Sequence, residues 1–310
     1  MSADYDSPWK EALDAYFEAF LELLFPDLHE LIDWSRGVES LDKEFQQVIR
    51  EAEVGRRYVD KLVKVWTLEG VECWVLIHVE VQTAREAEFP QRMYVYNYRI
   101  FDRYNKAVAS LAVLADDDPA WRPTEFRQSL FGCETGIRFP TVKLLDMIAK
   151  EAELEASANP FSKVVLAHLK ALETRGDPAR RHVWKIRLVR GLYERGFSAK
   201  DVRELFRLID WLMELPPPLA YRFREDINEL RKEKRMPYVT SIERIDREIG
   251  LRRGIQSLLK VRFGDEGLKL MPEIQQVYGA EKLEAILDVL ETAASTDEVR
   301  RLWTTGTPQA

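Results

Sequence analysis

The chain opens with apolar residues at helical spacing. Between Trp9 and Trp34 they recur every three to four positions, which is the period of one buried helix face. Pro26 interrupts this run, and an internal proline removes a backbone hydrogen bond and clashes with the preceding turn. We therefore predict a helix that breaks at Pro26 and resumes, with Ser7 and Pro8 as its N-cap and first helical residue.

Two segments of alternating polarity follow. Residues 58–66 and 72–82 place apolar and polar side chains in turn, which is the period of a half-buried strand. The turn signal Leu68-Glu-Gly70 lies between them, so we expect the two strands to form a β-hairpin. Cys73 falls on the second strand, where we expect a small buried thiol and not half of a disulfide.

Helical spacing returns between Phe89 and Ala107, and residues 108–115 form a short apolar run of the buried-strand type. The order of helix, strands, helix and strand predicts an α/β layer fold. The segment between Trp121 and Pro140 shows no regular period, and we assign no element to it.

From Thr141 onward the strand signals disappear and helical patterns take over, separated by clusters of Gly and Pro. The predicted helices are residues 142–156, 160–174, 179–195, 199–214, 219–234, 241–263, 267–278 and 281–290, with a last helical stretch at 295–303. We divide the chain into an α/β domain at 1–146, a helical region at 147–240, a small helical module at 241–304 and a loose tail at 305–310.

Composition narrows the class of protein only loosely. Hydrophobic residues make up 46% of the chain and charged residues 32%, as in a soluble globular protein. No apolar run of about 18 residues is present to span a membrane. The N-terminus lacks the basic-then-apolar order of a signal peptide, so we expect a cytoplasmic protein without a membrane partner.

The net charge of −7 conceals an uneven distribution. Residues 1–54 carry 14 acidic and 4 basic side chains, whereas residues 175–207 carry 10 basic and 4 acidic ones. Residues 220–262 carry 12 basic and 7 acidic side chains. A phosphate backbone could use this positive charge, and solvated helix faces with i,i+4 ion pairs would equally account for it.

Polar residues of the predicted hairpin provide the candidate chemistry. Period 2 places Glu80 and Gln82 on one face of the second strand, and Asp60 lies on the first. Neighbouring strands are about 4.8 Å apart, so carboxylates that project from the same face can converge on one divalent cation. The simpler alternative is that both carboxylates pair with basic neighbours, which are Arg57, Lys61 and Lys64.

The motifs around these residues resemble those of a known family. Val59-Asp60 followed by Glu80-Val-Gln82 is similar to the active-site signature of the PD-(D/E)XK nuclease superfamily, with Gln in place of the usual Lys. Three further segments resemble the recombination-promoting nuclease family, whose members are often labelled transposases: Leu41-Asp-Lys-Glu-Phe, Gly55-Arg-Arg-Tyr-Val-Asp-Lys-Leu and Arg92-Met-Tyr-Val-Tyr-Asn-Tyr-Arg-Ile-Phe-Asp102. The resemblance extends from about Trp9 to Trp303.

This resemblance implies a restriction-endonuclease-like α/β core, in which helices flank a mixed sheet, followed by an all-α C-terminal region. It implies a DNA endonuclease that depends on Mg²⁺ or Mn²⁺ and acts in DNA recombination or on mobile elements. Asp60, Glu80 and the carbonyl of Val81 would hold the metal ion, which activates a water and polarises the scissile phosphate. Gln82 lacks the positive charge of Lys and would instead orient a water by hydrogen bonding.

Three other residues are candidates for accessory roles. His78 shares the face of Glu80 and could be a ligand, a proton carrier or simply a buried strand histidine. Glu44 and Glu53 are candidates for the extra acidic residue that some superfamily members contribute from outside the hairpin. Plain surface charge is the alternative for both glutamates.

The predicted helix after the hairpin is a candidate DNA contact. Helical spacing places Arg92, Tyr96, Arg99 and Arg103 on one face. That face could hold phosphates, or it could pair with the acidic N-terminal segment. The whole protein is then either an endonuclease or a nuclease-like fold that binds DNA or protein without turnover. Since one site cuts one strand, a homodimer would suit the cleavage of duplex DNA.

Overall fold

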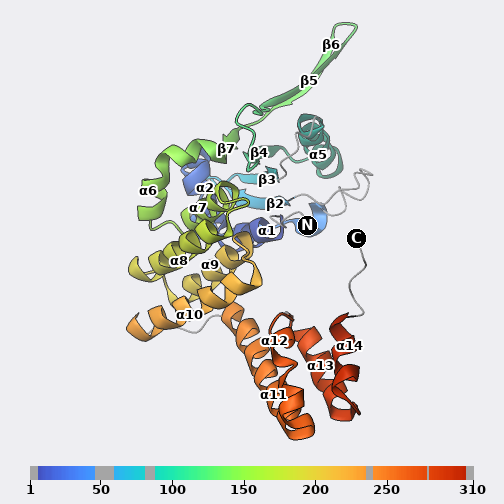
Figure 1. Cartoon of the computed structure of the whole chain (residues 1–310). Helices are drawn as coiled ribbons and strands as arrows, with labels where there is room; N and C mark the ends of the chain where they lie inside the picture. Colours follow the sequence, from blue (N-terminus) through green and yellow to red (C-terminus); the bar gives the residue numbers. More distant parts are fainter. Residues whose placement is uncertain (1–5, 46–58, 81–87, 235–239, 278, 305–310) are drawn as a thin grey trace. The chain divides into compact units, whose positions relative to one another are not determined.

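The structure is a computed structural model, which describes residues 6–45, 59–80, 88–234, 240–277 and 279–304 (Figure 1). The chain divides into two compact units, Met1–Glu214 and Leu215–Ala310. The first unit is mixed α/β and the second is helical. The domain boundaries at 146 and 240 remain predictions from the sequence.

A five-stranded mixed sheet organises the first unit, with the strand order β1-β2-β3-β4-β7. Its strands are β1 (Glu39–Ser40), β2 (Val59–Trp66), β3 (Glu72–Glu80), β4 (Val108–Leu114) and β7 (Thr141–Lys143). β2 pairs antiparallel with both β1 and β3, whereas β4 runs parallel to β3 and β7 runs parallel to β4. The predicted hairpin and the predicted strand at 108–115 are therefore confirmed.

Helix α5 (Phe89–Tyr104) makes the crossover between the parallel strands β3 and β4 and covers one face of the sheet (Figure 1). Leu62 and Leu76 of the sheet pack with Tyr96 and Ile100 of the helix in one fully buried cluster. The helix ends at Asn105, which adopts a left-handed backbone with φ of 50°. The predicted helix thus stops a few residues before Ala107.

Helices from distant parts of the sequence cover the opposite face. They are α1 (Asp6–Ala15), α2 (Phe17–Leu24), α3 (Pro26–His29) and α7 (Pro160–Glu173). The ring of Phe161 lies 5.5 Å from that of Trp9 and 5.1 Å from that of Phe20, so α7 is locked onto α1 and α2 by aromatic edges. The predicted break at Pro26 is confirmed, and the structure adds a second break at Tyr16.

The segment without a sequence assignment forms a second hairpin, β5 (Glu125–Leu130) with β6 (Cys133–Arg138). Most of its side chains are exposed, so no buried face imposed a hydrophobic period on the sequence. The expectation that strands end before Thr141 was wrong, because β7 begins there. Three residues are too short to show a period, and only the pairing with β4 defines β7 as a strand.

Most of the remaining helices agree with the predicted pattern, but two predicted helices were wrong in extent. The one predicted at 142–156 begins as β7 and continues as two short helices, and the one predicted at 267–278 contains only a separate helix of four residues, Met271–Ile274, after α11 ends at Leu268. In the first unit the remaining helices are the 3₁₀ helix η2 (Leu144–Lys150) and the α-helices α6 (Glu151–Ala156), α8 (Pro178–Glu194) and α9 (Ala199–Leu212). The second unit contains α10 (Pro217–Lys234), α11 (Thr240–Leu268), α12 (Met271–Ile274), α13 (Ala280–Thr292) and α14 (Thr296–Thr304). Among the described residues, no helix is long and apolar enough to cross a membrane.

Both cysteines are free thiols. Cys73 lies on β3 as expected, but it is half-buried and not fully buried. Cys133 is exposed at the start of β6.

A buried histidine joins the helical layer to the sheet. The indole Nε1 of Trp9 donates to Nδ1 of His168 at 3.2 Å, so the other ring nitrogen carries the proton and donates to the carbonyl of Ala115 at 2.7 Å. His168 is fully buried, and this burial lowers its pKa from 6.5 to about 4. The neutral imidazole is therefore part of the folded state.

This histidine makes folding stability depend on pH. The unfolded chain takes up a proton on His168 near pH 6.5, whereas the folded chain resists it until about pH 4. Stability is complete above pH 6.5 and falls as the pH drops towards 4, by up to about 3 kcal/mol from this residue. Urea unfolding at pH 7 and pH 4 should show this loss in the wild type. The His168→Gln variant should lose correspondingly less, and an equal loss in both proteins would contradict the assignment.

Candidate functional site

Three predicted site residues belong to the sheet face that α5 covers. Asp60 of β2 pairs with His78 of β3, and Glu80 lies two residues further along β3. Directly paired residues share a face of the sheet, and so do residues two apart on one strand. The backbone register therefore assigns Asp60, His78 and Glu80 to one face of neighbouring strands. The convergence of the two carboxylates on one ion stays a prediction, because the structure defines Asp60 only through this pairing.

Glu80 is buried at the end of β3, with 1% of its surface exposed. Its Oε2 accepts a hydrogen bond from Nη2 of Arg92 on α5 at 3.0 Å, and Arg92 is itself 7% exposed. The Arg92 guanidinium also lies 5.2 Å from the centre of the Phe89 ring. A buried carboxylate is costly unless it is paired, and the ion pair with Arg92 offsets part of that cost for Glu80.

Two of the three basic neighbours named as alternative partners form ion pairs elsewhere, and the third, Arg57, lies outside the described residues. Lys61 pairs with Asp14 of α1, and Lys64 pairs with Glu39 of β1 at 2.5 Å. The residue that does pair with Glu80 follows twelve positions later on a different element.

His78 is fully buried among aromatic rings. Its imidazole stacks on Tyr96 with ring centres 5.7 Å apart and planes inclined by 12°, and it meets the edge of Phe89 at 6.5 Å. Tyr96 in turn contacts Phe45 edge to face at 5.5 Å. This packing favours a structural strand histidine over a proton carrier, although the ring lies beside Glu80 on the same face.

The face of α5 that was expected to contact DNA is partly buried. Arg92 and Tyr96 point into the core, Arg99 is half-buried, and Arg103 is exposed beside Tyr104. Of the four residues predicted to share a phosphate-binding face, Arg92 and Tyr96 are therefore buried, and DNA contact by Arg99 and Arg103 stays a prediction. Charged side chains are usually exposed, whereas the charge of Arg92 is buried because it pairs with Glu80.

The other predicted residues add little to this site. Glu44 is half-buried, and its backbone carbonyl accepts a hydrogen bond from the Tyr104 hydroxyl at 3.3 Å. Glu53, Val81 and Gln82 lie outside the described residues.

A second buried ion pair at the same end of the sheet was missed by sequence reasoning. The Nζ of Lys143, the last residue of β7, donates to Oδ1 of Asp116 at 2.5 Å. Glu80 pairs with Leu114 and Leu114 pairs with Lys143, so the three residues are level across three parallel strands. In the described part of the chain, Oδ2 of Asp116 is buried without a hydrogen-bond partner. The sequence did contain a signal for an acidic residue at this edge, because the acidic run 116–118 directly follows the apolar strand.

This end of the sheet is where α/β proteins place their ligands, because the carboxyl ends of the parallel strands open there. Two buried ion pairs lie at this end of the sheet, Glu80 with Arg92 and Asp116 with Lys143. The described residues contain no group of three or more His, Cys, Asp or Glu side chains arranged to hold a metal ion.

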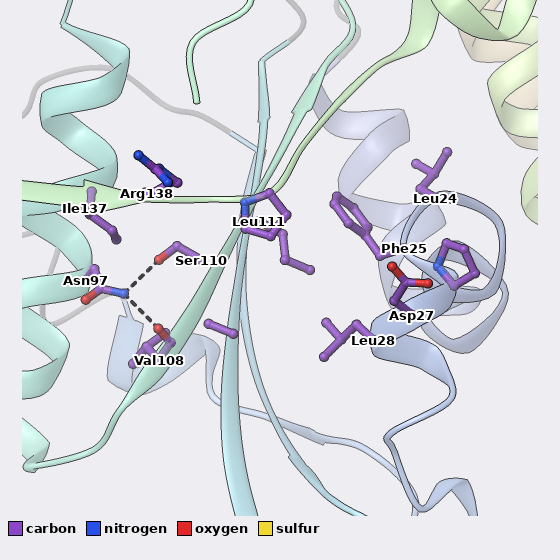
Figure 2. A pocket seen from close by; sticks show the side chains of 13 residues that line it. Leu24, Phe25, Asp27, Leu28, Asn97, Val108, Ser110, Leu111, Ile137 and Arg138 are labelled. Carbon is purple, nitrogen blue, oxygen red and sulfur yellow. Dashed lines mark hydrogen bonds between the residues drawn. The ribbon is translucent and has the colours of Figure 1, made fainter. Parts of the chain in front are cut away.

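A separate pocket of about 470 Å³ lies at the opposite end of β4 (Figure 2). Phe25, Leu28 and Leu111 form one wall, and Asn97 of α5 lies across the strand from them. The Asn97 amide donates to the carbonyl of Val108 at 2.9 Å and to the Ser110 hydroxyl at 3.0 Å. β7 pairs with β4 only from Ala112 onward, so the start of β4 borders this pocket as an open edge.

Comparison with known proteins does not extend this description: no protein-family model, no curated protein and no solved structure matches the chain.

Proposed function

We propose that the protein is a metal-dependent DNA endonuclease linked to recombination or mobile elements. The observation that carries this proposal is the assignment of Asp60 and Glu80 to one face of two neighbouring strands. The strand order supports it as well. An antiparallel hairpin continued by a parallel strand through a crossover helix is a mixed sheet flanked by helices, as the family resemblance implies.

The residue types fit a hard divalent cation. Mg²⁺ keeps several waters and commonly takes one or two carboxylates from the protein, so Asp60, Glu80 and the carbonyl of Val81 would suffice. The buried Oδ2 of Asp116, without a hydrogen-bond partner in the described structure, is a further oxygen acceptor at the same edge. When bound, Mg²⁺ or Mn²⁺ would activate a water and offset charge on the scissile phosphate.

The chain's own side chains have distinct parts in this proposal. Arg92 fixes one carboxylate oxygen of Glu80, so the position of that ligand is set before DNA arrives. Gln82 would orient the attacking water through its amide, since it cannot provide a positive charge. Lys143, although paired with Asp116, supplies a cation level with Glu80 across the sheet.

One observation favours a second candidate function. The charge of Glu80 is already matched by the buried guanidinium of Arg92, as it would be in a fold that no longer needs a metal ion. The second candidate is a nuclease-like module that binds DNA or protein without cleaving DNA.

Metal dependence separates the two candidates. With supercoiled plasmid and the purified full chain, we expect nicked circles in Mg²⁺ or Mn²⁺ and none in excess EDTA, because the proposed site needs the cation to offset the charge that develops on the scissile phosphate. Fluorescence anisotropy of a labelled duplex should be recorded in parallel, in Ca²⁺, to measure binding without turnover. Binding without nicking in either metal would favour the second candidate. Equal nicking in EDTA would exclude a metal-dependent site.

A further inference from the structure

The hairpin formed by β5 and β6 is an arm that extends from the first unit (Figure 1). Its base is held by Phe126, whose ring lies 5.2 Å from Tyr94 of α5. Its tip is apolar, with Leu130 68% exposed and Phe131 100% exposed. Phe131 and Gly132 both have positive φ, 51° and 84°, which is the two-residue turn that keeps hairpin strands tightly paired. A rigid arm with an apolar, exposed tip is a feature that a partner would cover.

The backbone of β6 is prepared for another strand. The amide of Phe139 donates to the carbonyl of Thr124 at 2.9 Å, which identifies this as a hydrogen-bonded pair of the ladder. Such pairs alternate with pairs whose amides and carbonyls point outward. Glu134, Gly136 and Arg138 therefore direct their backbone groups away from β5. The arm is a two-stranded sheet in the described structure, so this outer edge has no strand beside it.

We propose that two copies of the chain dimerise by antiparallel pairing of their β6 edges, with Gly136 opposite Gly136. In this register the outward-pointing backbone amides and carbonyls of one β6 strand lie opposite those of the other. The two arms then form one four-stranded sheet. The register also places Glu134 of each copy opposite Arg138 of the other. Within the arm Glu134 lies 3.9 Å from Arg127 and Arg138 lies 3.3 Å from Glu125. The two side chains are nevertheless 63% and 79% exposed, so a second copy can reach both. Opposite charges directly across an antiparallel ladder stabilise the pairing.

Charge disfavours the equivalent pairing of two copies through their β5 edges. The outward-pointing residues of β5 are Glu125, Arg127 and Ser129. If all three were used in an antiparallel pairing of two copies, Arg127 would face Arg127. Like charges directly opposite are destabilising, so the β6 edge is the favoured interface.

The same register gives the apolar tip a place to bind. With Gly136 at the centre, the turn at Phe131 and Gly132 reaches the level of Thr141 and Pro140 of the second copy. Pro140 borders the pocket beside β4, whose wall is apolar (Figure 2). Its volume of about 470 Å³ is in the range of ligand-sized cavities and can admit an aromatic side chain. Each copy thus offers both an unburied aromatic residue and an apolar recess, and reciprocal exchange makes a closed two-fold dimer.

Charge reversal tests the pairing. The molar mass of the full chain should be measured by sedimentation equilibrium at about 0.15 M salt, where long-range charge effects are screened. We expect a wild-type dimer and an association roughly a hundredfold weaker in either Glu134→Arg or Arg138→Glu, because each change places like charges opposite each other. A mixture of the two variants should dimerise again, since Arg then faces Glu at both positions. The matched control is Gln128→Glu, at an exposed residue of β5 on the other face of the arm, which should change the association less than about threefold.

Cross-linking tests the register independently of charge. In a Cys133→Ser background, Glu134→Cys mixed with Arg138→Cys should form an intermolecular disulfide, because paired residues of this type have Cα atoms about 5.5 Å apart. Arg127→Cys alone should not cross-link. The tip is tested by Phe131→Ser, which should weaken the dimer by roughly tenfold to a hundredfold without changing the far-UV circular dichroism of the folded chain.

Three outcomes would overturn the proposal. The first is a wild-type chain that is monomeric at about 100 µM, a concentration well above the micromolar affinity of weak interfaces. The others are failure of the mixed charge-reversal variants to re-associate, and cross-linking through Arg127→Cys. None of these measurements involves DNA cleavage. The dimer can therefore fail while the endonuclease stands, and the reverse.

Discussion

Plasmid nicking by the Asp60→Asn and Glu80→Gln variants is expected to fall by roughly a hundredfold to a thousandfold or more, the cost of removing one group that stabilises charge in a transition state. Each substitution replaces a charged oxygen ligand by a neutral amide in a site with few protein ligands. The initial rate of nicked-circle formation in Mg²⁺ is the quantity to measure, with circular dichroism to show that the variants are folded.

The choice of substitution matters because Glu80 is paired with a buried arginine. Glu80→Ala would leave Arg92 buried without that partner, at a cost of about 3–5 kcal/mol in stability, and lost activity could then reflect unfolding. Glu80→Gln keeps an oxygen that accepts from Arg92. Glu69→Gln, an exposed carboxylate in the turn between β2 and β3, is the matched control and should keep the full rate. Undiminished nicking by both site variants would place the activity elsewhere or in a contaminant.

Substitution of Gln82 is expected to give the second large effect. If its amide orients the attacking water, Gln82→Ala should lower the nicking rate roughly tenfold to a thousandfold, the range for a lost hydrogen-bond donor. Gln82→Lys should leave the rate equal or raise it, because a cation at this position favours hydroxide and the charge that develops on the phosphate. Initial rates of wild type, Gln82→Lys and Gln82→Ala at equal Mg²⁺ test both statements.

The outcome also separates an adapted nuclease from an inactive one. A series in which all three proteins bind DNA equally and none nicks it would contradict the endonuclease and leave the binding module. A rate that rises only in Gln82→Lys would instead mean that the fold and the metal site are intact and that the wild-type residue limits turnover.

Local patterns in the sequence predicted most of the elements around the site. The spacing of polar and apolar residues at 58–66 and 72–82 predicted two strands, and the period of a strand places His78 and Glu80 on one face. Both faces of β3 are buried, one of them under α5, so burial of a single face did not set this spacing. The crossover helix and the strand at 108–115 were predicted in the same way. Their apolar spacing is imposed by burial, which leaves a trace in the order of the residues.

Elements that bury few side chains show no hydrophobic period in the sequence. The β5–β6 arm is largely exposed, so its strands follow from backbone pairing and a tight turn and not from a hydrophobic period. β7 is a strand only because Thr141–Lys143 lie beside β4, a partner distant in sequence. Pairing between segments far apart in the chain is a tertiary property, which a local window cannot contain.

The polar residues of the site show most clearly which features follow from local sequence and which depend on tertiary structure. By itself, the sequence determined that His78 and Glu80 share a face of their strand, because the period of a strand is a local geometric fact. Only the register between β2 and β3, which pairs Asp60 with His78, brings Asp60 into this group. Only the tertiary structure decided that Arg92 turns inward to Glu80, that Tyr96 stacks on His78, and that Lys143 meets Asp116. A buried charge is stable only beside a partner, and which partner lies beside it depends on how α5 and β7 dock against the sheet.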